Sequence, residues 1–387
     1  MKEFKKLKVI ISGGGTGGHI FPALSIADSL RALNPETEIL FVGANGRMEM
    51  DRIPKHRIKD APAGYKIIGL DIHGLDRKNM FKNLTLPFKL WRSIRKSKKI
   101  IDEFQPDVVV GVGGYASFSL LKAAQMKGVP TLIQEQNAFA GKANQWIGKK
   151  AEKICVAFES MERFFPADRI LLTGNPIRSS MVPATPDSKK EGIREYGLDP
   201  NKKHILIVGG SLGCKTLNDA VLGWIETGCP AGNDVEILWQ CGKYYKEEID
   251  RTLQTMAAGN PTLSRVHHTD FIARMDLAYA AADLVISRSG ASSISELCAC
   301  GKASILVPSP NVTEDHQTVN AMVLVRKNAA LLIKDCEARE RLMCKSMGLV
   351  HSEEMLARME QNVRLLAKPD AARTIAEEVY RIVEEKE

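Results

Sequence analysis

The stretch ISGGGTGGHIFPALSIADSL, residues 11–30, places five glycines in six positions between an apolar run and a helical pattern. A strand that passes through a glycine-rich turn directly into a helix is the opening unit of a doubly wound α/β domain. The same order returns at residues 204–213, HILIVGGSLG, where an apolar run again ends in glycines. We therefore predict two domains built on one plan.

The rest of the chain alternates short apolar runs with helical stretches. Its 387 residues are enough for two domains of ordinary size. Short apolar runs separated by helices predict parallel sheets that are covered on both faces. The runs are KVIIS, EILFVG, DVVVGVGG, PTLIQEQN and KICVAF, then HILIVGG, EILWQCG, RVHHTDFI, DLVISRSG, KASILVPSP and AALLI.

A polar, proline-containing segment, PATPDSKKEG at residues 183–192, separates the two series of runs and is typical of a linker. The predicted fold class is therefore α/β, with Rossmann-like doubly wound domains at residues 1–178 and 179–366. We expect them to face each other across a cleft that holds the site. The C-terminal sequence DAARTIAEEVYRIVEE alternates apolar and acidic residues, which predicts an exposed amphipathic helix.

The composition limits the class of protein. The sequence shows no secretory signal and no apolar run of the roughly 18 residues that a membrane-spanning helix needs. Eight cysteines are scattered without C-x-x-C spacing, which favours buried, reduced thiols and a cytoplasmic location. A net charge of +8 favours an anionic partner. The charge alone does not distinguish nucleic acid, an acidic membrane surface and a phosphate-bearing substrate.

Residues 13–18 satisfy the G-x-G-x-x-G pattern of dinucleotide-binding domains. That mechanism requires an acidic residue at the end of the second strand, where this chain has Val42 and Gly43. A P-loop requires Lys and Ser or Thr after the last glycine, where His19 and Ile20 stand instead. The sequence therefore disfavours both NAD binding and ATP hydrolysis.

A more general function of the turn remains. Bare glycines let an anion approach the backbone, and the next helix offers unpaired N–H groups at the positive end of its dipole. Glycine-rich turns also occur at residues 111–117, 209–213 and 288–293, which disfavours the alternative that glycine serves only tight packing. His19 begins the helix, where a neutral imidazole would take a proton from a hydroxyl. The alternative is a histidine that only caps the turn or donates a hydrogen bond to a phosphate.

Seven motifs occur in a characteristic order: GGGTGGHIFPALSIA, GVGGYAS, QEQNAFAGKANQW, TGNPIR, GGSLGCKTLN, SRSGASSISEL and EDHQTVNA. With these motifs the sequence resembles the MurG family of bacterial N-acetylglucosaminyltransferases, glycosyltransferase family 28, over residues 8–383. The resemblance implies a GT-B fold and inverting transfer of N-acetylglucosamine from UDP-GlcNAc to the 4-hydroxyl of lipid I, which forms lipid II. It also implies that the C-terminal helix, 367–387, packs back on the first domain.

The resemblance assigns site residues motif by motif. Contacts to UDP-GlcNAc are expected from Thr16, Gly17, Gly18, Asn137, Arg178, Ser211, Ile272, Ala291, Ser292, Ser293, Ile294, Ser295, Glu296 and Gln317. Of these, Ser211 would bond a phosphate, Ile272 would pack at the uracil and Glu296 would accept from ribose hydroxyls. Gln317 would bond sugar hydroxyls. The acceptor diphosphate is expected at Gly14, Gly15, Gly113 and Gly114, with Tyr115 orienting the acceptor.

Two positions depart from the family pattern: Gln134 stands where a histidine is expected, and Cys214 where an alanine is expected. The general base is left open between His19 and Glu135. The chain contains no D-x-D motif, so we expect no metal held by that motif and no cofactor, with helix N-termini and Arg178 stabilising the leaving UDP.

A lipid acceptor requires contact with a membrane. Residues 79–101 combine Phe81, Leu84, Phe88 and Trp91 with seven lysines and arginines. This pattern predicts an interfacial helix on the anionic inner face of the cell membrane. The alternative is that the apolar stripe packs on the sheet and the basic residues are only solvated.

Two other functions remain to be separated from this one. A different GT-B enzyme would use a UDP-sugar with another acceptor. A nucleic-acid-binding protein is suggested by the net charge alone, and we expect none because the chain lacks zinc spacing, a helix-turn-helix signature and interleaved aromatic and basic residues.

Overall fold

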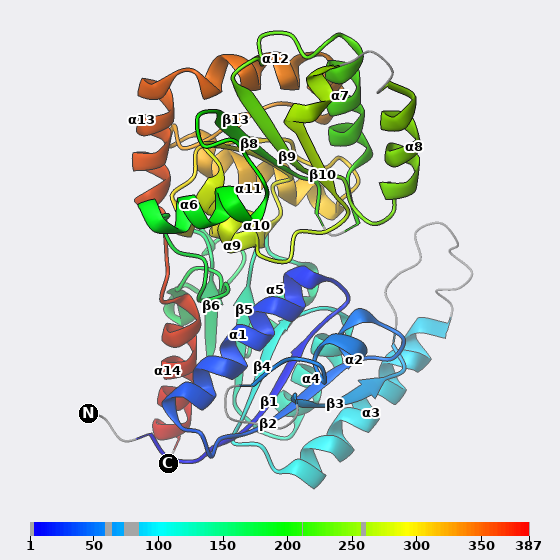
Figure 1. The fold of residues 1–387 in the computed structure, drawn as a ribbon. Coiled ribbons are helices and arrows are strands. Elements are labelled where there is room, and N and C mark those ends of the chain that lie inside the picture. Colours follow the sequence, from blue (N-terminus) through cyan, green and yellow to red (C-terminus); the bar gives the residue numbers. More distant parts are fainter. Residues whose placement is uncertain (1–3, 59–63, 73–84, 211, 257–260, 387) are drawn as a thin grey trace. The chain divides into compact units, whose positions relative to one another are not determined.

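The computed structural model describes residues 4–58, 64–72, 85–210, 212–256 and 261–386. The chain divides into two compact units (Figure 1). Unit 1 consists of Met1–Arg178 together with Lys368–Glu387, and unit 2 is Ser179–Ala367. Three residues of the predicted site and membrane helix, Phe81, Leu84 and Ser211, lie outside the described residues.

Unit 1 is a parallel seven-stranded sheet with strand order β3-β2-β1-β4-β5-β6-β7. Its elements are β1 (Lys8–Gly13), α1 (Gly17–Leu33), β2 (Glu38–Ala44), α2 (Met48–Arg52), β3 (Lys66–Leu70), α3 (Leu86–Phe104), β4 (Val108–Gly113), α4 (Tyr115–Met126), β5 (Thr131–Glu135), α5 (Lys142–Gly148), β6 (Lys153–Val156), β7 (Ile170–Leu172) and α14 (Ala371–Glu384). The predicted parallel sheet, covered by helices, is confirmed.

Alternate residues of each buried strand point to opposite layers of helices. In β1, Val9 and Ile11 pack against α1 and α14, whereas Ile10 packs against α3, α4 and α5. Both faces are apolar, which is why the strand reads as a continuous hydrophobic run rather than an alternating one.

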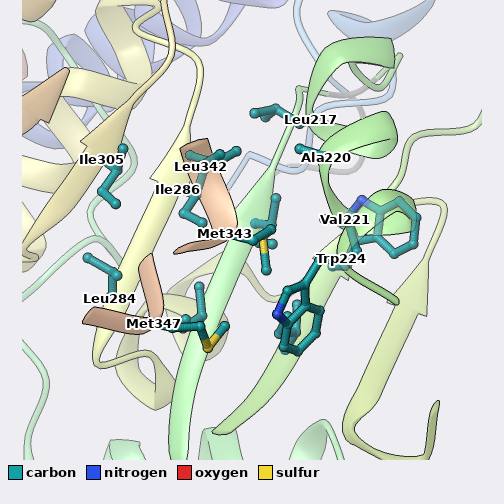
Figure 2. Close-up of a cluster of buried hydrophobic side chains, with 14 of the residues drawn as sticks. Leu217, Ala220, Val221, Trp224, Leu284, Ile286, Ile305, Leu342, Met343 and Met347 are labelled. Carbon is teal, nitrogen blue, oxygen red and sulfur yellow. The ribbon is translucent and has the colours of Figure 1, made fainter. Parts of the chain in front are cut away.

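Unit 2 is a second parallel sheet, with strand order β10-β9-β8-β11-β12-β13. Its elements are α6 (Pro186–Glu195), β8 (Lys203–Val208), α7 (Lys215–Glu226), β9 (Val235–Gln240), α8 (Lys246–Met256), β10 (Val266–Thr269), α9 (Met275–Ala281), β11 (Leu284–Ser287), α10 (Ala291–Cys300), β12 (Ser304–Leu306), α11 (His316–Val325), β13 (Leu331–Leu332), α12 (Ala338–Val350) and α13 (Glu353–Arg364). In its core, side chains of α7 and α12 pack with β11 and β12, as Figure 2 shows for Trp224, Met343, Ile286 and Ile305.

The C-terminal helix α14 differs from the exposed helix that its sequence predicted. Its apolar face is fully buried: Ile375, Ala376, Val379 and Tyr380 belong to the core of unit 1, next to α1. The pattern correctly predicted which face of the helix is apolar. It did not predict how deeply that face is buried, because polar residues lie between the apolar ones. No helix in the described part of the chain is both long and apolar enough to cross a membrane.

Candidate active site at two topological switch points

The glycine-rich turns lie where the strand order of each sheet reverses. In unit 1, β1 and β4 are neighbours although two strands separate them in sequence, and in unit 2 the corresponding neighbours are β8 and β11. At such a switch point the two strands feed helices on opposite sides, which leaves a crevice at their carboxyl ends where ligands bind. All four predicted turns, at residues 13–18, 111–117, 209–213 and 288–293, follow these four strands.

Four helices begin at these turns, and all four lack a cap. The N-cap residues of α1, α4, α7 and α10 make no side-chain cap hydrogen bond, and none of the four helices has an acidic residue in its first turn. By contrast, α6 has a complete Thr185–Ser188 capping box and Asp187 in its first turn. Helices α3, α5, α11 and α14 also begin without a cap hydrogen bond or an acidic first turn. What distinguishes the four helices at the switch points is that each begins at a glycine-rich turn, where its N–H groups and dipole favour an anion.

The two turns of unit 1 are packed directly together. The Gly14 N–H donates to Gly113 O at 3.3 Å, and a Cβ on Gly114 would lie 2.7 Å from Gly14 O. Gly113 and Gly114 have φ of +105° and +95°, which side chains rarely adopt. Packing therefore accounts for these glycines. A Cβ on Gly15 would meet no atom within 4 Å, but its φ of +87° still favours glycine, whereas one on Gly18 would meet only Thr16 Oγ1.

A buried carboxylate that the sequence analysis missed supports the first turn. Glu49, from α2, is 1% exposed, and its Oε2 accepts the Gly15 N–H at 2.8 Å while its Oε1 accepts the Ala44 N–H at 3.0 Å. A Cβ on Gly14 would lie 2.2 Å from Oε1, and one on Gly43 would lie 2.6 Å from Cγ. The bare turn thus makes room for Glu49 as well as for a ligand.

His19 lies in the first turn of α1, half-buried against the β4 turn. Its Nδ1 is 3.0 Å from Gly14 O, and a Cβ on Gly113 would lie 2.8 Å from its Nε2 and Cδ2. Because a carbonyl oxygen only accepts, Nδ1 carries the hydrogen in this contact, and in the neutral ring Nε2 then has the lone pair. The ring is therefore oriented as a base at Nε2.

Glu135, the other candidate base, is 2% exposed at the end of β5. Its Oε1 accepts from the backbone N–H and the side-chain amide of Asn137, and its Oε2 accepts from the Gly141 N–H and from Asn144 Nδ2 at 2.8 Å. Both oxygens are used to hold the loop that presents Asn137, so this carboxylate is poorly placed to take a proton from a substrate.

Gln134, which departs from the family pattern, belongs to a buried network of amides. Its Nε2 donates to Asn175 Oδ1 at 2.9 Å, and its side-chain carbonyl accepts from Gln136. Asn175 Nδ2 in turn donates to Gln136 O at 3.0 Å. The network joins the loop after β5 to the loop that leads to Arg178, whose guanidinium lies 5.9 Å from the ring centre of Phe21 on α1.

In unit 2 the β11 turn is fixed by Arg288. Its guanidinium donates to the carbonyls of Val307 and Pro308 at 2.9 and 3.0 Å and pairs with Asp335 at 2.5 Å. Gln317, from α11, is held to the same turn: its backbone carbonyl accepts from Ser289 Oγ, and its Oε1 accepts from the Ser309 N–H.

The predicted nucleotide segment, residues 291–296, forms the first turns of α10. Ser292 Oγ is buried and has no hydrogen-bond partner among the described residues, and Glu296 Oε2 accepts from Tyr279 OH at 3.2 Å. The Ile272 side chain is buried, and its N–H donates to Gln240 Oε1 at 3.1 Å. Gln240 Nε2 also donates to Gly210 O, so one side chain links the β8 turn to the segment expected at the uracil.

Two Rossmann-like units, each with paired glycine turns at its switch point, define the class of GT-B glycosyltransferases. Family models match both units: the glycosyltransferase family 28 N-terminal domain matches residues 9–156, and the C-terminal domain of that family matches residues 204–375. The chain belongs to glycosyltransferase family 28.

Full-length relatives support the same assignment. A protein of Bacteroides thetaiotaomicron is 52% identical over 380 residues, which are 98% of this chain and 99% of that protein. One of Porphyromonas gingivalis is 49% identical over 388 residues, which cover 99% and 97% of the two chains. Both are named UDP-N-acetylglucosamine–N-acetylmuramyl-(pentapeptide) pyrophosphoryl-undecaprenol N-acetylglucosamine transferase. The crystal structure of Acinetobacter baumannii MurG matches with a TM-score of 0.75 and 28% identity over 97% of this chain and 100% of that one.

Proposed function

We infer that this chain transfers N-acetylglucosamine from UDP-GlcNAc to the 4-hydroxyl of the N-acetylmuramoyl-pentapeptide of lipid I, with inversion, to form lipid II in peptidoglycan biosynthesis. The full-length relatives carry names that describe this transfer. The observation in the structure that carries the proposal is that four helices begin at glycine-rich turns of the two switch points, with no acidic residue in their first turns. The reaction involves two pyrophosphates, one in the nucleotide sugar and one in the lipid, and each needs such an anion site.

We propose that the donor is bound mainly by unit 2. Ser292 Oγ has no hydrogen-bond partner among the described residues, which supports a ligand at the start of α10. Glu296, whose Oε2 accepts from Tyr279 OH, is proposed to accept from the ribose hydroxyls. Because Gln317 Oε1 is taken by the Ser309 N–H, its NH₂ group is the end that would donate to the transferred sugar. Asn137 and Arg178 are proposed to complete the donor site from unit 1, where Thr16, Gly17 and Gly18 would contact the donor or the diphosphate of the acceptor.

The acceptor diphosphate is proposed to lie at the paired turns of unit 1, beside Tyr115. The Gly15 N–H is used by Glu49 and the Gly14 N–H by Gly113 O, so neither points to a ligand. The N–H groups of Thr16, Gly17 and Gly18 make no hydrogen bond within the described residues and are the donors that remain at this turn. The glycines at 14, 15, 113 and 114 would therefore shape the site more than bind the phosphate.

For the chemical step we propose His19 as the base, because the hydrogen bonds of Glu135 commit both of its oxygens. Nε2 would take the proton of the 4-hydroxyl while that oxygen bonds to the anomeric carbon and the bond to UDP breaks. Charge on the departing UDP would be met by the starts of α7 and α10 and by Arg178.

We also propose that unit 1 rests on an anionic membrane through α3. Phe88 and Trp91 are 64% and 54% exposed, with ring centres 6.0 Å apart, and Arg95 lies 5.6 Å from the Trp91 ring. The opposite side of α3 packs on the unit through Ile100 and Ile101. These exposures favour an interfacial helix over the alternative in which the aromatic side chains pack on the sheet.

The experiment is a transfer assay with radiolabelled UDP-GlcNAc and lipid I in detergent, with product identified by mass. We expect the disaccharide lipid, saturable in both substrates, and binding of UDP-GlcNAc tighter than that of UDP-glucose or NADH. Transfer to a different acceptor, with none to lipid I, would assign the chain to another GT-B activity. No affinity for UDP-GlcNAc would overturn the proposal.

A further inference from the structure

We propose that Glu49 is a positioning residue for His19 and acts on it through the peptide group between Gly14 and Gly15. The inference rests on the proposed function, in which His19 takes the acceptor proton.

The geometry that carries this inference is a single peptide group bonded at both ends. Its N–H, from Gly15, donates to Glu49 Oε2 at 2.8 Å, and its carbonyl, from Gly14, lies 3.0 Å from His19 Nδ1. Carboxylate, peptide and imidazole therefore form one continuous chain of hydrogen bonds. All its donors point the same way, from the imidazole toward the carboxylate.

Such a chain strengthens each of its bonds, because a carboxylate on the N–H polarises the peptide and makes its carbonyl a better acceptor. A better acceptor at Nδ1 fixes the tautomer that leaves the lone pair on Nε2. When Nε2 takes the hydroxyl proton, the positive charge on the imidazolium is then stabilised by Glu49 through the peptide. The arrangement performs the task of an aspartate bonded directly to a histidine, with a peptide in between.

The residues around Glu49 bury its carboxylate and leave space for it. Glu49 is 1% exposed, and its second oxygen is held by the Ala44 N–H, so water does not compensate its charge. Glycine at positions 14 and 43 leaves the space that Glu49 fills, since a Cβ at either would lie within 2.6 Å of it. The other ionisable side chains on the helices around this turn are Asp51 and Arg52 on α2, Asp28 and Arg31 on α1, and Tyr115 and Lys122 on α4. Arg178 lies beside Phe21 of α1.

The test is the Glu49→Gln variant, in which a neutral amide has one acceptor oxygen for two N–H donors. We expect kcat for transfer to lipid I to fall about 10- to 100-fold, as for other lost supports of a reacting group. The KM for UDP-GlcNAc should stay within about twofold, and the acidic limb of the kcat–pH profile should move to lower pH. In a His19→Gln background, Glu49→Gln should cause little further loss, because the two residues act as one unit.

The matched control is Glu236→Gln. Glu236 is also a buried carboxylate that accepts a backbone N–H, from Asp199 at 2.7 Å, but it lies in unit 2 and outside the site. We expect its kcat and pH profile to match those of the wild type. A wild type that does not transfer to lipid I would overturn the proposed function. If the wild type is active, an unshifted kcat–pH profile of Glu49→Gln would overturn only this inference. Additive losses of kcat in the double variant would do the same.

One measurement needs no variant at Glu49. In wild-type protein with ¹⁵N-labelled histidine, the ring nitrogens of His19 should show Nδ1 protonated and Nε2 bare at neutral pH. The assignment can be made by comparison with a His19→Gln spectrum. The opposite tautomer would overturn the inference even if Glu49→Gln failed to fold.

Discussion

Glycine at position 113 leaves room for the His19 ring, and this can be tested with one methyl group. In Gly113→Ala the new Cβ would lie 2.8 Å from Nε2, at a φ of +105°. We expect a loss of stability of about 1–2 kcal/mol from the backbone strain. We also expect kcat to fall roughly 100-fold, since a shift of about 1 Å in a reacting group has that effect. Thermal melting and transfer assays measure the two losses.

Gly128→Ala is the control for that substitution. Gly128 also has a positive φ, +69°, but a Cβ there would meet no atom within 4 Å. It should show the loss of stability without the loss of kcat. Equal kcat in the two variants would mean that the His19 ring does not depend on the space at Gly113.

A second residue-scale prediction concerns pH and stability. His204 is 2% exposed, and burial lowers its pKa, against the opposing effects of Asp283, Asp199 and Glu236. Below about pH 6.5 the unfolded chain binds a proton at this residue that the folded chain does not yet bind. The contribution of His204 to stability is therefore present above pH 6.5 and falls as the pH falls through that value.

His351 should show the opposite dependence and serves as the comparison. Hydrogen bonds to the Met347 carbonyl and to Asp234 raise its pKa, so its contribution is present at low pH and is lost as the pH rises above about 6.5. Urea denaturation of His204→Gln and His351→Gln between pH 5 and 8 measures both. For each variant we compare the free energy of unfolding with that of the wild type. If this difference changes with pH in the same direction for both variants, the assigned pKa directions are wrong.

At this scale the sequence predicted His19 as a candidate base, but it did not predict that Glu49 contacts the first turn. At the end of the second strand, where a dinucleotide site requires an acidic residue, the chain has Val42 and Gly43. Glu49 comes a few residues later and is 34 positions from Gly15, and nothing in its local sequence indicates that it turns back to the first turn. Contacts of this kind follow from the folded path of the chain, which a local pattern does not contain.

At the scale of elements, two strands escaped the sequence analysis, and both are at the edges of the first sheet. β3 and β7 have half-exposed residues where the central strands are fully buried. An edge strand needs no continuous apolar run, and β7 has only three residues, so its hydrophobic signal is weak. The central strands β1, β4, β5, β8 and β9 were all predicted because both of their faces are buried.

Helix α14 supports a prediction about how the C-terminal residues stabilise unit 1. Tyr380 is fully buried, its ring centre is 4.7 Å from that of Phe4, and its hydroxyl lies 2.9 Å from Thr37 Oγ1. Tyr380→Ala leaves a cavity and an unpaired hydroxyl, so we expect a loss of about 3–5 kcal/mol in urea denaturation. Tyr244→Ala, at a tyrosine that is 82% exposed, should change stability by less than about 0.5 kcal/mol. Similar losses in both variants would mean that α14 is not part of the core of unit 1.

At the scale of the whole molecule, the net charge of +8 has a local counterpart on α3, where exposed aromatic side chains stand among lysines and arginines. Not all of that charge is available to a lipid, because Lys96 Nζ donates to Gly69 O. The prediction that belongs to this scale separates membrane contact from chemistry, which a water-soluble acceptor analogue makes possible.

Replacing both Phe88 and Trp91 with Ser removes the two exposed aromatic side chains and leaves the basic ones. Each side chain would lose the burial energy it gains in the interface, so we expect binding to anionic liposomes to weaken by roughly tenfold per residue. Turnover on the soluble analogue should stay near that of the wild type. The control is Met355→Ser with Leu365→Ser, which removes a similar exposed apolar area from unit 2 and should leave liposome binding intact. Because the remaining attraction is electrostatic, binding of the α3 variant should also be the more sensitive to salt. If liposome binding and turnover of the soluble analogue fall equally, the two aromatic side chains stabilise the fold, and α3 does not contact the membrane.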